Sequence, residues 1–232
     1  MAGLQTIVDY CNGMTINRRK VVGIQITRNE IPRLSTTPTK NPWKFSLDMP
    51  SSFSYSDARQ LMEALDTLDR TGYQDISFSN NACLNWIFRY QGSLSQSQLA
   101  GMTIQSFNGD QLVLTNLPAV SGTRVLFEPN DLIQINGFPY PFTSTTQVLR
   151  GGSSIVTVTT HRPNIITGGS ATVAGRSLIV GNACQFRLFC PNMPVYKLLP
   201  GGAKYAAGGT LINNALIEWS DAFELYEYVG TS

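Results

Sequence analysis

The only histidine of the chain, His161, is the first residue whose type could support catalysis, because imidazole is a common general base near neutral pH. It precedes Arg162 and Pro163 at the end of an alternating segment. A catalytic base needs a nucleophile to activate and an acid to orient it, and no Gly-x-Ser-x-Gly arrangement surrounds Ser153 or Ser154. We therefore expect a structural role for His161, and we assign no catalytic residue to the chain.

Two further patterns fall short of known catalytic or ligand-binding motifs. Gly151 and Gly152 resemble a phosphate-binding loop only in part, because no Gly-Lys-Ser/Thr follows them, and a hairpin turn explains the pair better. Asp66, Asp69 and Asp75 lack the spacing of a calcium-binding EF-hand loop. A glycosidase needs two converging carboxylates, which a sequence alone cannot place. An enzyme such as a cell-wall hydrolase is thus the weakest of the functions considered.

Metal and cofactor chemistry is not expected either. The cysteines form no Cys-x-x-Cys pair, and one histidine cannot complete the usual zinc ligand sets. The four cysteines are Cys11, Cys83, Cys184 and Cys190. We expect free, mostly buried thiols in a protein made in a reducing cytosol, with no metal and no cofactor.

Aromatic residues offer a possible binding platform next to the predicted hairpin. Phe138, Tyr140 and Phe142 alternate with Pro139 and Pro141. Exposed aromatic rings can stack on sugars or on nucleic-acid bases. Aromatic residues beside a hairpin belong to the protein core more often, so a core position is the favoured interpretation here.

The charge of the chain is low and unevenly distributed. Charged residues make up 14% of the sequence, against roughly 25% in typical soluble domains. The deficit favours extensive protein contacts, although a plain β-rich domain explains it equally well. Residues 1–50 contain seven basic and three acidic residues, and residues 213–232 contain four acidic residues and no basic one. Copies of the chain could therefore pair head to tail, or the two ends could neutralise each other within one molecule.

Other classes of partner find little support in the sequence. A formal net charge of +2 is too small to indicate nucleic-acid binding. The N-terminus lacks the basic region and the apolar run of a signal peptide. No apolar stretch is long enough for a transmembrane helix, so we expect no membrane partner.

The first ninety residues predict strands and one amphipathic helix. Residues 21–28 and 43–49 both alternate, which predicts two paired strands. The Pro/Thr-rich segment 31–42 between them predicts an extended edge or loop without a regular ladder. A helix is predicted over 55–71, with Ser54 as its cap. Its apolar stripe is Ala58, Leu61, Met62, Leu65 and Leu68.

After a soft, polar segment at 91–103, the sequence predicts only short strands separated by turn residues. These are 111–115, 123–127, 131–136, 144–149, 154–160 and 171–179, with a further strand beginning at 184–189. Residues 215–228 suit either a helix or a closing strand, and we favour the strand. A Gly/Ala-rich loop at 200–209 precedes them.

Three blocks, taken in order, resemble tailed-bacteriophage tail proteins. One is residues 131–163, with DLIQING, an aromatic strand, a Gly-Gly turn and a His-Arg-Pro ending. Another is the strand 43–49 that ends at a proline and leads into the helix and Gly72, and the third is the strand 184–189 with its Phe-Arg-Leu core. The chain departs from the family pattern at Asn130, where the family has glycine, at Asn136, and in its tail after residue 200.

The resemblance implies a mainly β (α+β) fold. It predicts a tail-tube-like β-sandwich or barrel with one flanking helix, formed by residues 1–94 and 181–232, and an inserted small β-barrel or sandwich domain at 95–180. We expect the segments 31–42 and 200–209 to order only in an assembly.

The same resemblance implies a virion structural protein of the phage tail end or baseplate. It is expected to form or join a ring around the tail tube, with other tail proteins and itself as partners. Its expected location is the virion tail, and the host cytoplasm during assembly. The alternative is a receptor- or glycan-binding β module of the tail.

Overall fold

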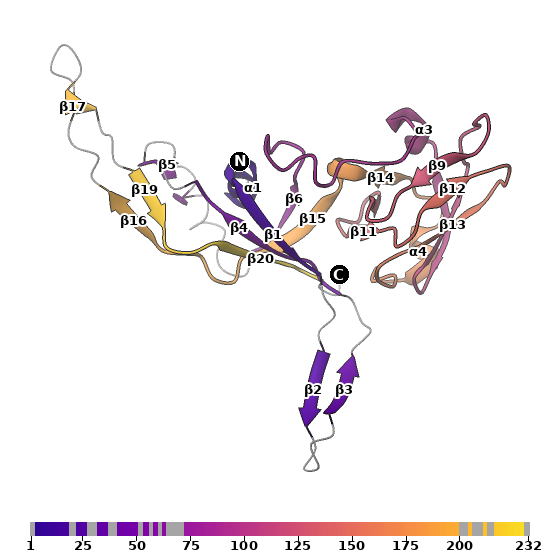
Figure 1. Ribbon diagram of the computed structural model, residues 1–232, viewed down its shortest axis with the longest axis horizontal. Helices are drawn as coiled ribbons and strands as arrows, with labels where there is room; N and C mark the ends of the chain where they lie inside the picture. Colours follow the sequence, from indigo (N-terminus) through magenta and orange to yellow (C-terminus); the bar gives the residue numbers. More distant parts are fainter. Residues whose placement is uncertain are drawn as a thin grey trace. The chain divides into compact units, whose positions relative to one another are not determined.

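A computed structural model shows a mainly β protein with several antiparallel sheets and a few short helices (Figure 1). The structure describes residues 3–18, 22–26, 32–36, 41–50, 53–55, 58–59, 62–63, 72–199, 204–205, 211–212 and 216–229. Within these residues none of the sheets closes into a barrel. The predicted mainly β fold class is confirmed.

The chain divides into two compact units, and each combines segments that are distant in the sequence. Unit 1 comprises residues 1–16, 44–87 and 185–228, and unit 2 comprises residues 17–43, 88–184 and 229–232. The chain therefore returns to unit 1 after completing most of unit 2. Long-range strand pairing, and not local hairpins alone, holds unit 1 together.

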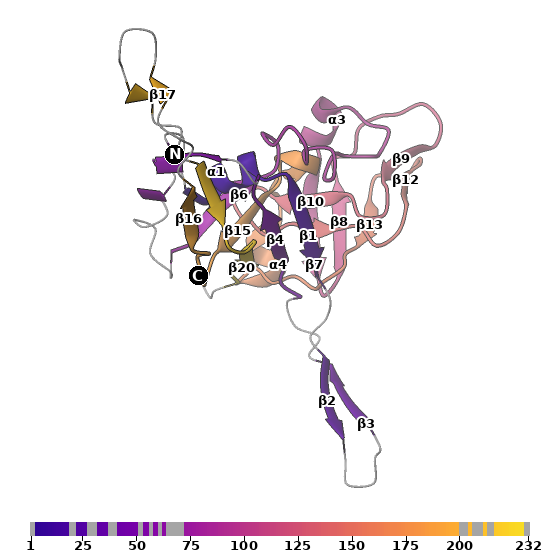
Figure 2. The ribbon, with the colours of Figure 1, turned by 60° about the vertical axis from the view of Figure 1, so that its left-hand side comes forward.

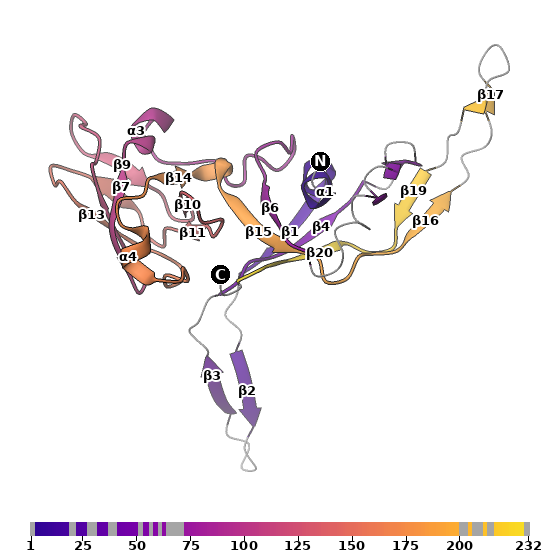
Figure 3. The same cartoon turned by 180° about the vertical axis from the view of Figure 1, so that it is seen from behind.

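Unit 1 contains a five-stranded sheet. Its strands, in spatial order, are β1 (Gly13–Asn17), β4 (Lys44–Asp48), β20 (Phe223–Glu227), β15 (Gln185–Phe189) and β6 (Gln74–Ser77). The late strands β20 and β15 lie inside this order and pair antiparallel with each other. Strand β20 also pairs with β4, and β15 also pairs with β6. Helix α1 (Gly3–Tyr10) packs against β6, as Figure 3 shows from behind.

The core of unit 1 forms because apolar residues alternate along these strands and bury one face of the sheet. Phe45 in β4, Phe186 in β15 and Phe78 just after β6 are almost fully buried. The centroid of the Phe45 ring lies 5.3 Å from that of Phe78 and 5.1 Å from that of Phe186. From α1, Leu4 and Ile7 add a buried stripe at helical spacing.

Two smaller sheets extend unit 1. One has the order β16 (Tyr196–Leu199), β19 (Leu216–Trp219) and β5 (Phe53–Ser54). The other pairs β17 (Lys204–Tyr205) with β18 (Leu211–Ile212). The C-terminal segment was predicted to be strand and not helix, and β19 and β20 confirm this.

Unit 2 is built mainly from three small antiparallel sheets around one apolar core (Figure 2). The first is β13 (Val156–Thr159), β8 (Gln111–Thr115) and β7 (Thr103–Asn108); the second is β11 (Phe142–Thr143), β10 (Leu132–Ile135) and β14 (Leu178–Val180); the third is β12 (Val148–Arg150) and β9 (Arg124–Phe127). Short helices α3 (Gln96–Ala100) and α4 (Gly169–Val173) and the 3₁₀ turn η1 (Gly181–Ala183) connect them. Asn-Gly at 108–109 allows the tight β7–β8 turn, because Gly109 takes a φ of 57°.

A separate two-stranded sheet consists of β2 (Val22–Ile26) and β3 (Pro32–Thr36). Five residue pairs face each other along it, from Val22 opposite Thr36 to Ile26 opposite Pro32. Within the described residues this ladder has no third strand. Two-stranded hairpins are marginally stable by themselves in water, so this element depends on contacts beyond its own ladder.

The predicted partner of the strand at 21–28 was wrong. It pairs with β3, which lies in the Pro/Thr-rich segment that was predicted to lack a ladder, while β4 pairs with β20 and neighbours β1. Pro32 is compatible with β3 because it occupies the end of the ladder, where a missing N–H costs no interior bond. Residues 37–40 of this segment lie outside the described residues.

Two predictions in unit 2 were also wrong. Gly151 and Gly152 are not a hairpin turn, because β12 pairs with β9 while β13 pairs with β8, so the glycine pair links two sheets. The strand predicted at 171–179 begins as helix α4, and only residues 178–179 of it belong to a strand. The alternation of apolar residues over this short stretch does not separate one turn of helix from a strand.

The predicted helix at 55–71 falls mostly outside the described residues. The described positions within it, Tyr55, Ala58, Arg59, Met62 and Glu63, are helical, and Ala58 is fully buried. Most of the loop predicted at 200–209 is likewise outside the described residues, and Lys204–Tyr205 forms β17.

Candidate functional site

His161 lies beside the short strand β11 and forms two hydrogen bonds with the backbone of Thr143 in that strand. The His161 N–H donates to the Thr143 carbonyl at 3.0 Å, and the Thr143 N–H donates to His161 Nδ1 at 2.9 Å. Because Nδ1 accepts a hydrogen bond, the proton of the neutral ring is assigned to Nε2. This geometry makes His161 a brace for the backbone of β11.

The electrostatic surroundings keep His161 neutral. Burial lowers its pKa to about 3, and the positive charges of Arg162 and Arg18 lower it in the same direction. A base with such a low pKa has little driving force to accept a proton near neutral pH. The predicted structural role of His161 is thus consistent with both its contacts and its pKa.

The neighbouring Arg162 is buried, with 1% of its surface exposed. Its Nη2 donates to the Pro141 carbonyl at 2.8 Å, and its guanidinium carbon lies 5.1 Å from the centre of the Phe142 ring. Trp43 Nε1 donates to the same Pro141 carbonyl at 3.2 Å. A delocalised guanidinium suits such a position, because it is weakly hydrated and can stack on an aromatic ring.

Both ends of the segment that carries β2 and β3 meet this cluster. Before β2, Arg18 Nη1 donates to Thr143 Oγ1 at 2.8 Å, and Arg18 Nη2 donates to Asn130 Oδ1. After β3, the Trp43 ring lies edge-on to His161, with centroids 5.4 Å apart, and Arg18 stacks over Trp43 at 5.5 Å. We call these contacts the hairpin base: Arg18 and Trp43 on one side, and Asn130, Pro141, Thr143, His161 and Arg162 on the other.

The hairpin base was not anticipated from the sequence. Trp43 was assigned only to the apolar face of a strand, and Arg18 only to a basic segment. The sequence carries no motif for it, and only the structure shows that Asn130 takes a positive φ of 73° at this point. Asparagine tolerates this left-handed conformation better than most residues, and here its side chain also receives Arg18.

The remaining candidate residues are placed in separate surroundings. Ser153 Oγ donates to the Ile155 carbonyl at 2.8 Å in the loop between β12 and β13. Asp75 forms a two-pronged ion pair with Arg187, at 2.8 and 3.0 Å. Asp66 and Asp69 lie outside the described residues. Asp75 therefore acts through an ion pair across the β6–β15 ladder of unit 1.

The cysteines are free thiols, and three of them are buried: Cys11, Cys184 and Cys190. Burial raises the pKa of Cys11 to about 12 and that of Cys190 to about 11, and it raises the pKa of Cys184 furthest. These thiols stay protonated at neutral pH and pack as small apolar groups. Cys83 is exposed. Among the described residues, no cluster of His, Cys, Asp and Glu could hold a metal ion.

The aromatic residues proposed as a ligand platform belong to the core of unit 2. Phe142 is fully buried and Tyr140 is 7% exposed, and Phe138 packs against the same cluster. The outer face of Phe138 is covered by Arg176, whose guanidinium carbon lies 4.7 Å from the ring centre. The favoured interpretation of this motif, core and not platform, is confirmed.

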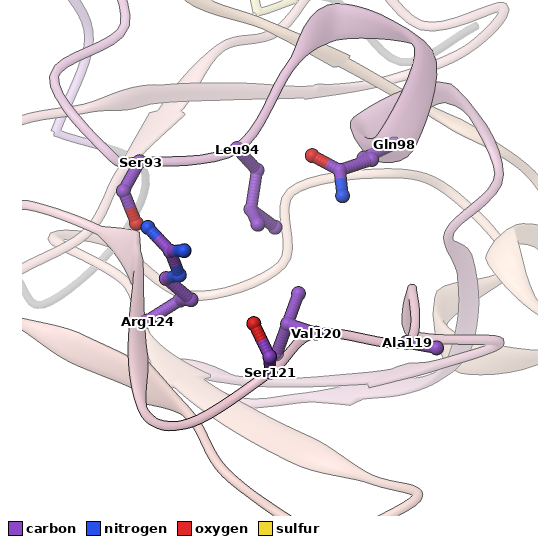
Figure 4. A pocket seen from close by; sticks show the side chains of 7 residues that line it. All are labelled: Ser93, Leu94, Gln98, Ala119, Val120, Ser121 and Arg124. Atoms are coloured by element: carbon purple, nitrogen blue, oxygen red, sulfur yellow. The ribbon is translucent and has the colours of Figure 1, made fainter.

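A cavity of about 280 Å³ lies elsewhere in unit 2, between the segment 93–98 and the segment 119–124. Figure 4 shows Leu94 and Val120 directed into it from opposite sides, with Gln98, Ser121 and Arg124 around them. We call it the Arg124 pocket. Sequence reasoning missed it, because its residues come from the soft segment at 91–103 and from a loop before β9, neither of which carries a motif.

Comparison with known proteins leaves the geometry as the basis for a functional argument. No protein-family model matches the chain, and no curated protein matches it closely enough to indicate a relationship. Among the helices that the structure describes, none is long and apolar enough to cross a membrane.

The neutral state of His161 gives a testable pH dependence. The unfolded chain takes up a proton near pH 6.5, whereas the native protein does so only at a pKa of about 3. Stability is therefore complete above about pH 6.5 and falls as the pH decreases toward 3. Between pH 7 and 5.5 we expect wild type to lose about 1 kcal/mol more than His161→Gln, measured by urea unfolding at both pH values. Equal losses in the two proteins would show that His161 is not buried in the neutral form.

Proposed function

We propose that the protein is a virion structural component of a bacteriophage tail end or baseplate, where it forms or joins a ring around the tail tube. The ordered sequence blocks that resemble tail proteins support this, as does the mainly β fold. A chain with 14% charged residues also suits a protein whose surface is largely covered by protein contacts, because interface cores are depleted of charge.

The observation that carries the proposal is the isolated β2–β3 ladder. Its backbone forms a regular five-pair hairpin without a third strand among the described residues. A hairpin of this kind gains stability when a neighbouring chain covers one face or adds a strand to an edge. We propose that a second copy of this chain supplies that neighbour.

The hairpin base supports this role mechanically. Arg18 and Trp43 fasten the two ends of the segment to buried carbonyl and hydroxyl groups of unit 2. Trp43 is almost fully buried, with 2% of its surface exposed. A contact element that is held at both ends loses less conformational freedom on binding, which favours association.

Part of the charge is neutralised within one molecule, since Lys44 forms an ion pair with Glu224 of the acidic C-terminal segment at 2.5 Å, and the remaining charges allow a head-to-tail contact as well. Unit 1 contains a hollow of about 260 Å³ whose lining includes Asp48, Glu218 and Asp221. The segment of β2 and β3 contains Arg28 and Arg33 in sequence. Opposite charges on two such surfaces steer association and fix the register of the contact.

A pair of matched substitutions tests the assembly role. In an antiparallel ladder, the positions of Ile24 and Leu34 share one face, and those of Gln25 and Arg33 share the other. We expect Ile24→Asp to prevent oligomer formation, because it places a charge on the apolar face, and the neutral change Gln25→Ser to leave it intact. Light scattering after size-exclusion chromatography and negative-stain microscopy measure the outcome.

The melting temperature of both variants should match that of the wild type, since the core of unit 2 is formed by other strands. A wild-type protein that stays monomeric at micromolar concentration, alone and with other tail proteins, contradicts the proposal. So does a ring that forms equally well with Ile24→Asp.

The finer expectations remain part of this proposal. They are a tail-tube-like domain at 1–94 and 181–232, an inserted domain at 95–180, no enzymatic activity, and residence in the virion tail. Partners are other tail proteins and further copies of the chain, without nucleic acid or membrane.

A receptor- or glycan-binding module is the second candidate. Tyr140 and Phe142 no longer support it, because they are buried. The Arg124 pocket does, because it gathers several polar groups around one small cavity.

A further inference from the structure

The Arg124 pocket carries one charge, and it is positive. Among the residues that line the cavity, Arg124 is the only one of a charged type. Within the described part of the chain no carboxylate pairs with Arg124. A guanidinium with its donors unused favours a planar oxyanion such as a carboxylate, which it can bind through two parallel hydrogen bonds.

Gln98 presents donors to the same cavity because its oxygen is already used. Gln98 Oε1 accepts from the Ser95 N–H at 2.9 Å, in the capping box that begins α3. The Nε2 group of the side chain is therefore the end that remains, and Figure 4 shows it directed into the cavity. A capping box fixes the side chain in this orientation, so the amide is arranged before any ligand arrives.

Two hydroxyl groups complete the polar rim. Ser93 Oγ donates its hydrogen to the Val125 carbonyl at 3.0 Å, which leaves its lone pairs to accept from a ligand hydroxyl. Ser121 Oγ points toward the cavity in Figure 4 and has no hydrogen bond within the described residues. Leu94 and Val120 pack against the core of unit 2 behind these groups, so the surface that faces the cavity is mainly polar.

We propose that the Arg124 pocket binds a small sugar acid, with its carboxylate on Arg124 and Gln98 and its hydroxyls on Ser93 and Ser121. The volume of about 280 Å³ is far larger than a bare carboxylate needs and lies at the lower end for small-molecule sites, which suits one monosaccharide residue. The surface that lines the cavity is mainly polar, which suits a ligand rich in hydroxyl groups.

This site is independent of the assembly role. None of its lining residues belongs to the β2–β3 ladder or to the hairpin base. The Ile24→Asp variant should bind the sugar acid as the wild type does, so that a failure of either proposal can be recognised without the other.

Ligand-observed saturation-transfer NMR on the full-length protein tests the site with methyl β-glucuronide as the probe and methyl β-glucoside as its neutral match. We expect saturation transfer to the glucuronide, with a dissociation constant on the order of millimolar because the site is open to water. The glucoside should bind at least about tenfold more weakly, since it lacks the carboxylate.

Two variants and one matched control locate the binding. Gln98→Glu keeps the capping box, because glutamate accepts from Ser95 as well as glutamine does, and it removes the amide donors while adding a negative charge. We expect it to abolish binding. Arg124→Gln should weaken binding about tenfold or more. Arg89→Gln removes an equally exposed arginine of unit 2 outside the pocket and should leave binding unchanged.

Unchanged melting temperatures confirm that the variants fold. The proposal is overturned if the glucuronide gives no saturation transfer, if Gln98→Glu binds it as well as the wild type does, or if the glucoside binds equally well. It is also overturned if inorganic phosphate or N-acetylglutamate displaces the glucuronide at equal concentration, since the pocket would then recognise any anion or a protein carboxylate.

Discussion

Replacing Asn81 with leucine is expected to lower the free energy of unfolding by about 4 kcal/mol. Asn81 is 1% exposed and joins the end of α1 to the turn after β6. Its Nδ2 donates to the carbonyls of Val8 and Cys11, at 2.6 and 2.9 Å. Its Oδ1 accepts from the N–H groups of Cys83 and Leu84, at 2.8 and 2.7 Å. Leucine fills the volume but removes a hydrogen bond from all four backbone groups, and within the described residues only the Val8 carbonyl keeps another partner, the Cys11 thiol at 3.2 Å.

Urea unfolding followed by circular dichroism measures this loss. The matched control is Asn80→Leu, because Asn80 is the adjacent asparagine and is exposed. It should change stability by less than about 0.5 kcal/mol. If both substitutions cost the same, the hydrogen bonds of Asn81 do not hold α1 in place.

Phe186→Ala should cost about 4 kcal/mol, because it opens a cavity in the core of unit 1. The Phe186 side chain is fully buried, and its ring stands edge-on to Phe45 and Phe78, with centroids 5.1 and 5.7 Å away. The central position of β15 in the sheet prevents the neighbouring strands from collapsing into the space.

Phe189→Ala, on the same strand, provides the comparison. Phe189 is only partly buried and faces Tyr226 and Tyr228 at 6.0 and 6.2 Å. We expect less than half the loss measured for Phe186→Ala, by thermal or urea unfolding. Equal losses would mean that the aromatic cluster around Phe45 does not form the core of unit 1.

Strands with clear alternation could be predicted from the sequence almost to the residue. The expected strand at 111–115 is β8, and the one at 184–189 is β15 within one residue. The C-terminal segment was also assigned correctly, because the aromatic and β-branched residues in it favour strand over helix. Successive side chains of a strand point to opposite faces of the sheet, so a strand with one buried face alternates apolar and polar residues. This alternation can be seen directly in the sequence.

Pairing between strands was harder to predict, because the partner of a strand is set by contacts far along the chain. Strand β2 (22–26) pairs with the next strand along the chain, β3, which begins at Pro32. Strand β4 (44–48) instead pairs with β20, near the C-terminus. Helix α1 was missed although Leu4, Ile7 and Val8 have helical spacing, because eight residues with no acid in the first turn and no base in the last give a weak signal.

The candidate site shows the same division. The core position of Phe142 and the structural role of His161 follow from residue type, since lone aromatic and histidine residues are usually packed. The Arg124 pocket and the hairpin base depend on residues brought together from separate segments, such as Gln98 and Arg124, which are 26 residues apart, and neither leaves a motif in the sequence.

The placement of β20 and β15 inside the five-stranded sheet sets an order of events during synthesis on the ribosome. Strands β1 and β4 emerge early, but the strand that joins β4 to the rest of the sheet is β20 (Phe223–Glu227). Residues 88–184 leave the exit tunnel before β15 and β20 do. They can form the core of unit 2 while the sheet of unit 1 is still incomplete. At 5–20 residues per second, the wait is on the order of ten seconds. During that time the N-terminal strands have unpaired edges. These edges can pair with strands of nascent chains on neighbouring ribosomes.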